Sequence, residues 1–166
     1  DQRTIVPFPD YETFLLTWDK VRTLDVASSA GIPIPRTWRL DGDPDALADR
    51  LPYPVVLKTR SQTWIDHGRG RSAYVTGMNY VRSRDEFRRR CEEIRGAAPE
   101  FIVQEYVHGY AAGVAALFNR GEPRATFAYR RLREYPVSGG PSTLRESIRD
   151  PRLVDAAVRI LRAMRW

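Results

Sequence analysis

Lysine is rare in this sequence, so either its two positions need a compact ammonium or the bias toward arginine is chance. Of the 27 basic residues among 166, only Lys20 and Lys58 are lysine. A lysine ammonium is a compact point charge, and its hydrogen bond to a charged group contributes about 1.5–3 kcal/mol. Lys58 ends the apolar run 54–57, so it would stand at the end of a buried strand and face a polar loop. The residues alone support two interpretations equally: a phosphate ligand, or a lysine that merely extends its ammonium into water.

A glycine-rich loop follows Lys58, and its composition is typical of loops that bind phosphate. Gly68 and Gly70 stand two residues apart, and Ser72 follows them. The glycines let the backbone approach a ligand closely, and the Ser72 hydroxyl can donate a hydrogen bond. The spacing is neither that of a Walker A loop nor that of a dinucleotide-binding fingerprint. An ordinary surface loop over 59–72 therefore remains the alternative.

The segment 104–107 has the groups needed to bind a planar base. The backbone of Glu105, Tyr106 and Val107 offers carbonyl acceptors and amide donors, and the Gln104 side chain adds a further hydrogen bond. This segment ends an apolar strand and leads to Gly109, where the two halves of the chain meet. A plain linker is the alternative, since short connections between elements are common.

Cations and a glycine-rich turn recur later in the chain. Arg130 and Arg131 precede a loop that contains Gly139, Gly140, Ser142 and Thr143. Arginine forks bind carboxylates and phosphates bidentately, so this region could hold a substrate or a transferring phosphate. The alternative is a charged edge strand that discourages aggregation.

Composition argues against several other kinds of site. Cys91 is the only cysteine, which excludes an internal disulfide and a cysteine-rich zinc site. Two histidines, His67 and His108, make a histidine-based metal site improbable, and no Gly-x-Ser-x-Gly motif marks a serine nucleophile. No apolar run approaches the roughly 20 residues that span a bilayer, and the first residues lack the apolar core of a signal peptide. We therefore expect a cytoplasmic protein.

The net charge of +6 raises the alternative of a basic nucleic-acid-binding module. The basic residues, however, are spread along the whole sequence. Their densest cluster, 82–90, is interleaved with acidic residues in 85–93. This alternation is typical of a solvated helix face with ion pairs between successive turns, so nucleic acid is not the expected partner.

The hydrophobic patterns predict an α+β chain. Helices are expected over 11–30, ended by Gly31, over 44–51, from a capping box at 83–86 to Gly96, and from 151 onward. Strands are expected over 37–40, 54–58, 73–76 and 101–104, with a hairpin formed by 114–118 and 125–129. Polar segments at 59–72 and 138–143 are expected to be loops.

The order of these motifs resembles the ATP-grasp superfamily, in particular its carboxylate–amine ligase-like members. The resemblance covers the chain from about residue 10 to residue 166. It implies an ATP-grasp fold of two small α+β subdomains with ATP between them. The first would comprise 1–103, with a lid loop at about 59–72. A hinge at 104–109 would connect it to the truncated start of the second, 110–166.

The resemblance also implies a role for each candidate residue. Phosphate would be bound by Lys20 and Lys58 beneath the lid around Gly68, Gly70 and Ser72. Adenine would meet the Gln104 side chain and the backbone of Glu105, Tyr106 and Val107. Arg131 and Arg130 would contact the transferring phosphate or the substrate, and Gly139, Gly140, Ser142 and Thr143 would lie on the substrate side.

The family reaction transfers the terminal phosphoryl group of ATP to a carboxylate, after which an amine or similar nucleophile attacks the acyl phosphate. It needs Mg²⁺, but the acidic residues after Glu134 do not form the family's Glu-x-Asn pattern. Tyr110 also stands where many members place an acidic ribose ligand. We therefore expect a piece of a longer protein whose metal ligands and N-terminal domain lie outside this chain, which alone would be a poor enzyme. A non-catalytic nucleotide-binding pseudo-ligase and a homodimer both stay open.

Overall fold

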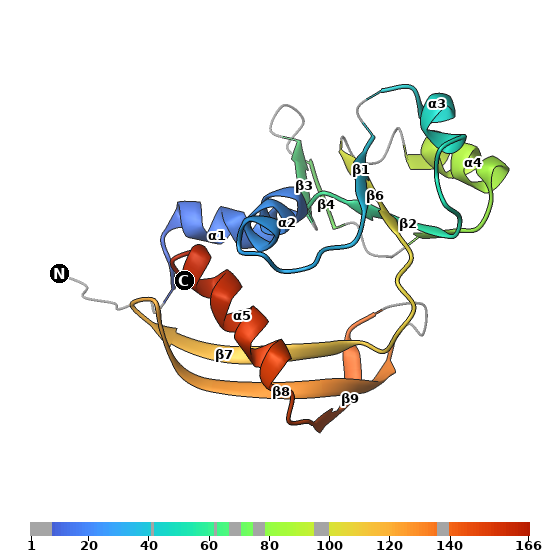
Figure 1. Ribbon diagram of the computed structural model, residues 1–166. Helices are drawn as coiled ribbons and strands as arrows, with labels where there is room; N and C mark the ends of the chain where they lie inside the picture. Colours follow the sequence, from blue (N-terminus) through green and yellow to red (C-terminus); the bar gives the residue numbers. More distant parts are fainter. Residues whose placement is uncertain are drawn as a thin grey trace. The chain divides into compact units, whose positions relative to one another are not determined.

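The computed structural model describes residues 8–40, 42–61, 63–66, 71–74, 79–94, 100–135 and 140–166 (Figure 1). A four-stranded antiparallel sheet has the order β1 (Thr37–Arg39), β6 (Phe101–Glu105), β2 (Val55–Thr59) and β5 (Asn79–Val81). The predicted strands at 37–40, 54–58 and 101–104 are confirmed. β5 is an additional strand that the sequence analysis missed, because three residues are too few to show an alternating pattern.

The two faces of this sheet have different environments. On one face, Val55, Leu57 and Val103 are fully buried in a core that also contains Phe87 and Cys91 of α4 (Arg84–Ile94). α3 (Pro44–Ala48) packs against α4 and closes the core. Because side chains alternate along a strand, Val56, Lys58 and Gln104 lie on the other face. The core thus fixes the strands that carry two of the predicted ligand-binding side chains.

The predicted loop at 59–72 is partly wrong. The chain forms a two-stranded antiparallel hairpin of β3 (Thr63–Asp66) and β4 (Arg71–Tyr74), in which Ile65 pairs with Ser72. The strand predicted at 73–76 therefore begins earlier, at Arg71. Gly68 and Gly70 lie outside the described residues.

The single helix predicted over 11–30 is two helices. α1 (Tyr11–Trp18) and α2 (Lys20–Ser29) are separated by Asp19, whose backbone is extended at φ −94° and ψ 112°. The Asp19 carboxylate accepts hydrogen bonds from the backbone nitrogens of Val21 at 2.9 Å and Arg22 at 3.3 Å. The periodic apolar residues continue through the break, so hydrophobic spacing alone predicted one helix. Gly31, at φ +68°, ends α2 as expected.

A three-stranded sheet contains β7 (Ala112–Asn119), β8 (Glu122–Glu134) and β9 (Ser142–Ser147), in that order. The predicted hairpin is confirmed, and its turn has positive φ at Arg120 and Gly121, as a tight two-residue connection requires. The loop predicted at 138–143 ends earlier than expected, because β9 begins at Ser142. α5 (Pro151–Ala163) starts at the predicted cap, where Asp150 accepts from two backbone nitrogens.

The chain divides into two compact units that are not continuous in sequence. The first comprises Asp1–Pro33, Gly113–Tyr129 and Ser147–Trp166, and the second comprises Ile34–Ala112 and Arg130–Glu146. The segment 104–109 lies inside the second unit, and the subdomain boundaries expected from the sequence stay a prediction. Among the described residues, no helix is long and apolar enough to cross a bilayer.

Candidate functional site

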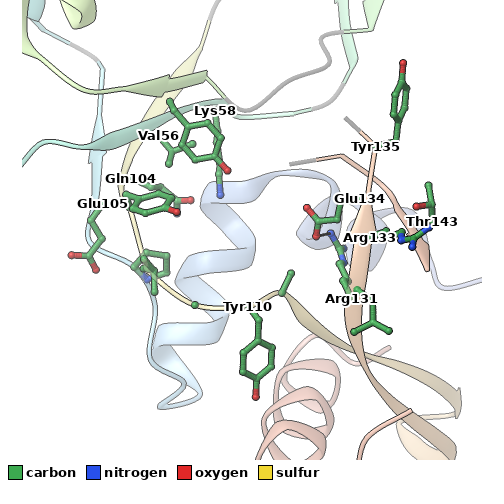
Figure 2. A pocket seen from close by; sticks show the side chains of 17 residues that line it. Val56, Lys58, Gln104, Glu105, Tyr110, Arg131, Arg133, Glu134, Tyr135 and Thr143 are labelled. Atoms are coloured by element: carbon green, nitrogen blue, oxygen red, sulfur yellow. Dashed lines mark hydrogen bonds and ion pairs between the residues drawn. The ribbon is translucent and has the colours of Figure 1, made fainter. Parts of the chain in front are cut away.

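A cavity of about 980 Å³ lies within the second unit (Figure 2). Most of its lining comes from three places: the face of the four-stranded sheet that does not bear the core, the segment after β6, and strands β8 and β9. The lining residues include Pro35, Val56, Lys58, Tyr80, Gln104, Glu105, Tyr106, Val107, Tyr110, Arg131, Arg133, Glu134, Tyr135 and Thr143.

Lys58 brings a positive charge into this cavity. The side chain is half-buried, and burial lowers the pKa of its ammonium below the ordinary value of 10.5. Within the described part of the chain, no carboxylate forms an ion pair with Lys58. A cation that has lost part of its hydration without gaining a counterion is prepared to bind an anionic group.

Gln104 and the following residues line another part of the cavity. Gln104 is only 5% exposed, and its side-chain nitrogen donates to Thr37 Oγ1 at 3.1 Å. The Tyr106 ring meets the Tyr80 ring edge to face, with centroids 5.6 Å apart. The next residue, Val107, has an exposed apolar side chain. Buried polar groups beside apolar and aromatic surface are the usual composition of a site for a planar heterocycle.

The two candidate arginines differ in their surroundings. Arg131 lines the cavity, and its Nη1 lies 3.3 Å from Oε1 of Glu134, which lines it too. Arg130 is absent from the lining: it forms an ion pair with Glu146 of β9 and lies over the Tyr110 ring, 5.5 Å from the centroid. Arg131 can therefore contact a ligand in the cavity, whereas Arg130 does not line it.

Comparison with known proteins gives independent evidence on the fold of this chain. No family model matches the chain. It is 29% identical over 116 residues to the vancomycin/teicoplanin A-type resistance protein VanA of Enterococcus faecium, which covers 69% of this chain and 31% of that protein.

Two solved structures match nearly the whole chain. The D-alanine–D-alanine ligase of Bacillus anthracis complexed with ATP has a TM-score of 0.64 and 20% identity, covering 94% of this chain and 49% of that one. The RimK domain protein ATP-grasp of Sphaerobacter thermophilus has a TM-score of 0.61 and 20% identity, covering 92% and 52%. The chain has the ATP-grasp fold. It spans about a third of the length of VanA and about half of the length of the two solved proteins.

Within this ATP-grasp fold, the cavity brings together several of the predicted site residues. Lys58, Gln104, Glu105, Tyr106, Val107, Arg131 and Thr143 line it. Ser142 does not line it: its hydroxyl donates to the backbone oxygen of Leu144 at 3.1 Å. Gly140 is absent from the lining as well, and Gly139 lies outside the described residues.

The remaining candidates belong to α2 and β4. Lys20 is the first residue of α2, in the first unit. The backbone of Ser72 belongs to β4. Their predicted roles at a phosphate site stay predictions.

The sequence did not predict Tyr80, which lines the cavity, or Thr37, which lies outside the lining but binds the lining residue Gln104. Tyr80 lies in the unpredicted strand β5, directly opposite Val56. Thr37, which binds Gln104, was expected only as part of a strand. The signal for both is strand register, which pairs Val56 with Tyr80 and Thr37 with Gln104, and a single sequence does not reveal register.

Proposed function

We propose that this chain is the ATP-binding part of an ATP-dependent ligase that activates a carboxylate as an acyl phosphate for attack by an amine or similar nucleophile. One observation carries the proposal. In a chain with the ATP-grasp fold, a single cavity contains the half-buried Lys58, the buried Gln104 with its neighbouring backbone, and Arg131. Cations for phosphate and a polar, apolar-flanked wall for a base are what a nucleotide requires.

The proposed reaction has two steps. A carboxylate oxygen attacks the terminal phosphorus of ATP, and ADP leaves. The amine then attacks the acyl carbon, and inorganic phosphate leaves. Such chemistry depends mostly on positioning and on neutralising charge. In this scheme Lys58 binds the phosphates and Arg131 neutralises charge on the transferring group, while Glu134 holds the Arg131 guanidinium in place.

Magnesium would normally assist phosphoryl transfer. Among the described residues, no group of three acidic, histidine or cysteine side chains lies close enough to hold a metal ion. Both carboxylates in the cavity already have partners: Glu134 meets Arg131, and Glu105 accepts from the backbone nitrogen of Arg36 at 2.8 Å. These residues do not fit a magnesium site.

The proposal is tested by isothermal titration of the chain with ADP. We expect saturable binding that Lys58→Ala weakens at least about tenfold, because the substitution removes a charge-assisted hydrogen bond. Arg88→Ala is the matched control: Arg88 is a basic residue of α4 that pairs with Asp45 on the protein surface, so its loss should leave ADP affinity unchanged. No saturable binding of ADP, or equal affinity in the wild type and Lys58→Ala, would argue against the proposal.

A DNA-retention experiment addresses the nucleic-acid alternative. The arginines of α4 are engaged in ion pairs: Arg84 with Asp49 at 2.6 Å, Arg90 with Glu93 at 2.7 Å, and Arg88 with Asp45. We therefore expect no retention on duplex DNA at physiological salt, about 0.15 M, where ADP binding persists. Turnover belongs to the whole protein, and a ligase assay of the full-length protein with candidate amino acids separates an active ligase from a non-catalytic one.

A further inference from the structure

A short chain of hydrogen bonds fixes the side chain of Gln104. The Thr37 hydroxyl donates to the backbone oxygen of Pro35 at 2.9 Å, and the Gln104 amide nitrogen, Nε2, donates to Thr37 Oγ1 at 3.1 Å. Thr37 and Gln104 are directly paired in the ladder between β1 and β6. The neighbouring step of that ladder is fixed as well, because the Glu105 nitrogen donates to the Arg36 oxygen at 3.0 Å.

The chemistry of these groups settles which end of the Gln104 carboxamide faces Thr37. A hydroxyl has one proton, and that of Thr37 is used by the Pro35 carbonyl, which can only accept. Thr37 Oγ1 is therefore an acceptor toward Gln104. Only the carboxamide nitrogen can donate to it, because two acceptors would repel each other.

The carboxamide oxygen is consequently the atom left for a ligand. Gln104 lines the cavity, whereas Thr37 does not. Within the described part of the chain, the hydrogen bond to Thr37 is the one interaction of the Gln104 side chain. An acceptor that faces a cavity favours a ligand that brings a donor and disfavours one that brings a second acceptor.

We propose that Thr37 is a positioning residue that fixes the Gln104 carboxamide oxygen toward the cavity, so that the site selects a base with an exocyclic amino group over one with an exocyclic oxygen. The inference rests on the proposed nucleotide site and adds the residue that sets its base preference. Adenine presents an amino donor at carbon 6, whereas hypoxanthine and guanine present an oxygen there. Without Thr37 the carboxamide could turn over and bind either kind of base.

The test compares ADP with IDP, which differ in the base alone, by titration of the complete 166-residue chain. The wild type should prefer ADP by about tenfold or more. Thr37→Val keeps the side-chain shape but removes the acceptor, and should reduce this preference at least about fivefold by weakening ADP and strengthening IDP. Thr37→Ser keeps the hydroxyl and should retain the wild-type preference. A purely structural role of Thr37 would weaken both nucleotides together and leave their ratio unchanged.

Each result bears on the inference. A reduced ADP-to-IDP ratio in Thr37→Val that Thr37→Ser restores supports it. An unchanged ratio in Thr37→Val, or a wild type that binds both nucleotides equally, overturns it and leaves the nucleotide site intact. Absence of all nucleotide binding by the wild type overturns both proposals. Thr37→Ala also removes the hydroxyl, and it replaces Thr37→Val if that variant does not fold by circular dichroism.

Discussion

At the scale of single residues, Lys58 is a charged side chain that is half-buried. The core on one face of the four-stranded sheet holds β2 in place, and this places the Lys58 ammonium at the cavity. Burial lowers its pKa because the charged form loses hydration. Between that lowered pKa and 10.5, the unfolded chain binds more protons than the folded chain, so Lys58 makes the folded state more stable as pH rises through this window.

Nucleotide binding should reverse this effect of burial. A bound phosphate favours the ammonium and raises the Lys58 pKa, so binding takes up a proton wherever the free chain is partly deprotonated. We expect ADP affinity to fall as pH rises through the lowered Lys58 pKa toward 10.5. Titrations in two buffers with different ionisation enthalpies measure the proton uptake directly.

Lys58→Arg is the control for this pH dependence. A guanidinium keeps its charge throughout this range, so the variant should bind ADP with an affinity that stays level with pH and without proton uptake. An equally steep decline in the wild type and in Lys58→Arg would show that another group causes the pH dependence.

At the scale of elements, Asp19 determines where the N-terminal helical region is divided. Its carboxylate satisfies two backbone nitrogens at the start of α2, while its own nitrogen donates to Leu15 at the end of α1. The Asp19 cap also determines that Lys20 is the first residue of α2. The local polar group decided the structure here, although the apolar spacing favoured one continuous helix.

Removal of this cap should destabilise the protein measurably. We expect Asp19→Ala to lower the free energy of unfolding by about 1 kcal/mol, as the loss of an N-cap side chain typically does. Asp19→Asn retains a capping oxygen and should lose less. Asp25→Ala removes an exposed carboxylate from the same helix and should stay within about 0.5 kcal/mol of the wild type. Urea denaturation compares the variants, and an Asp19→Ala protein as stable as the Asp25→Ala protein would contradict the capping role.

Some elements of the fold could be predicted from the sequence, and others could not. Long apolar runs and explicit caps, such as those at 54–58 and 150–151, predicted β2 and α5 because the local signal and the fold agree. Short strands such as β3, β4 and β5 carry too few residues for a periodic signal and form by pairing with a partner. The Thr37–Gln104 hydrogen bond connects residues 67 positions apart, so it follows from strand register rather than from any local pattern.

At the scale of the whole molecule, the units are interleaved along the chain. The core of the second unit forms within one stretch, since β1, β2, β5, β6, α3 and α4 all lie between Thr37 and Glu105. The first unit instead requires α2 to meet α5, and Arg159 of α5 donates to the backbone oxygen of Ala30, 129 positions away. Closing so long a loop costs entropy before any contact is gained.

This arrangement predicts an order of folding. In pulsed hydrogen exchange, the amides of β2 and β6 should become protected before those of α2, because their contacts are closer in sequence. Protection of all three elements at the same rate would contradict this order. The later protection of α2 should depend on α5, because the two helices are in contact. A destabilising substitution at the α5 cap, such as Asp150→Ala, should therefore mainly delay the protection of α2.

The long separation of α2 from α5 also matters while the protein is being made. After Ser29 the ribosome must add roughly 120 residues before Pro151 joins the chain, which takes about 6–24 s at typical rates of synthesis. Throughout that interval α5 does not yet exist, so the unit that contains Phe14 and Trp18 is incomplete. The rings of these two residues lie 5.4 Å apart in the finished protein. The helices α1 and α2 are thus completed as part of their unit only after α5 has been synthesised, and until then the segment that carries Phe14 and Trp18 is vulnerable to aggregation.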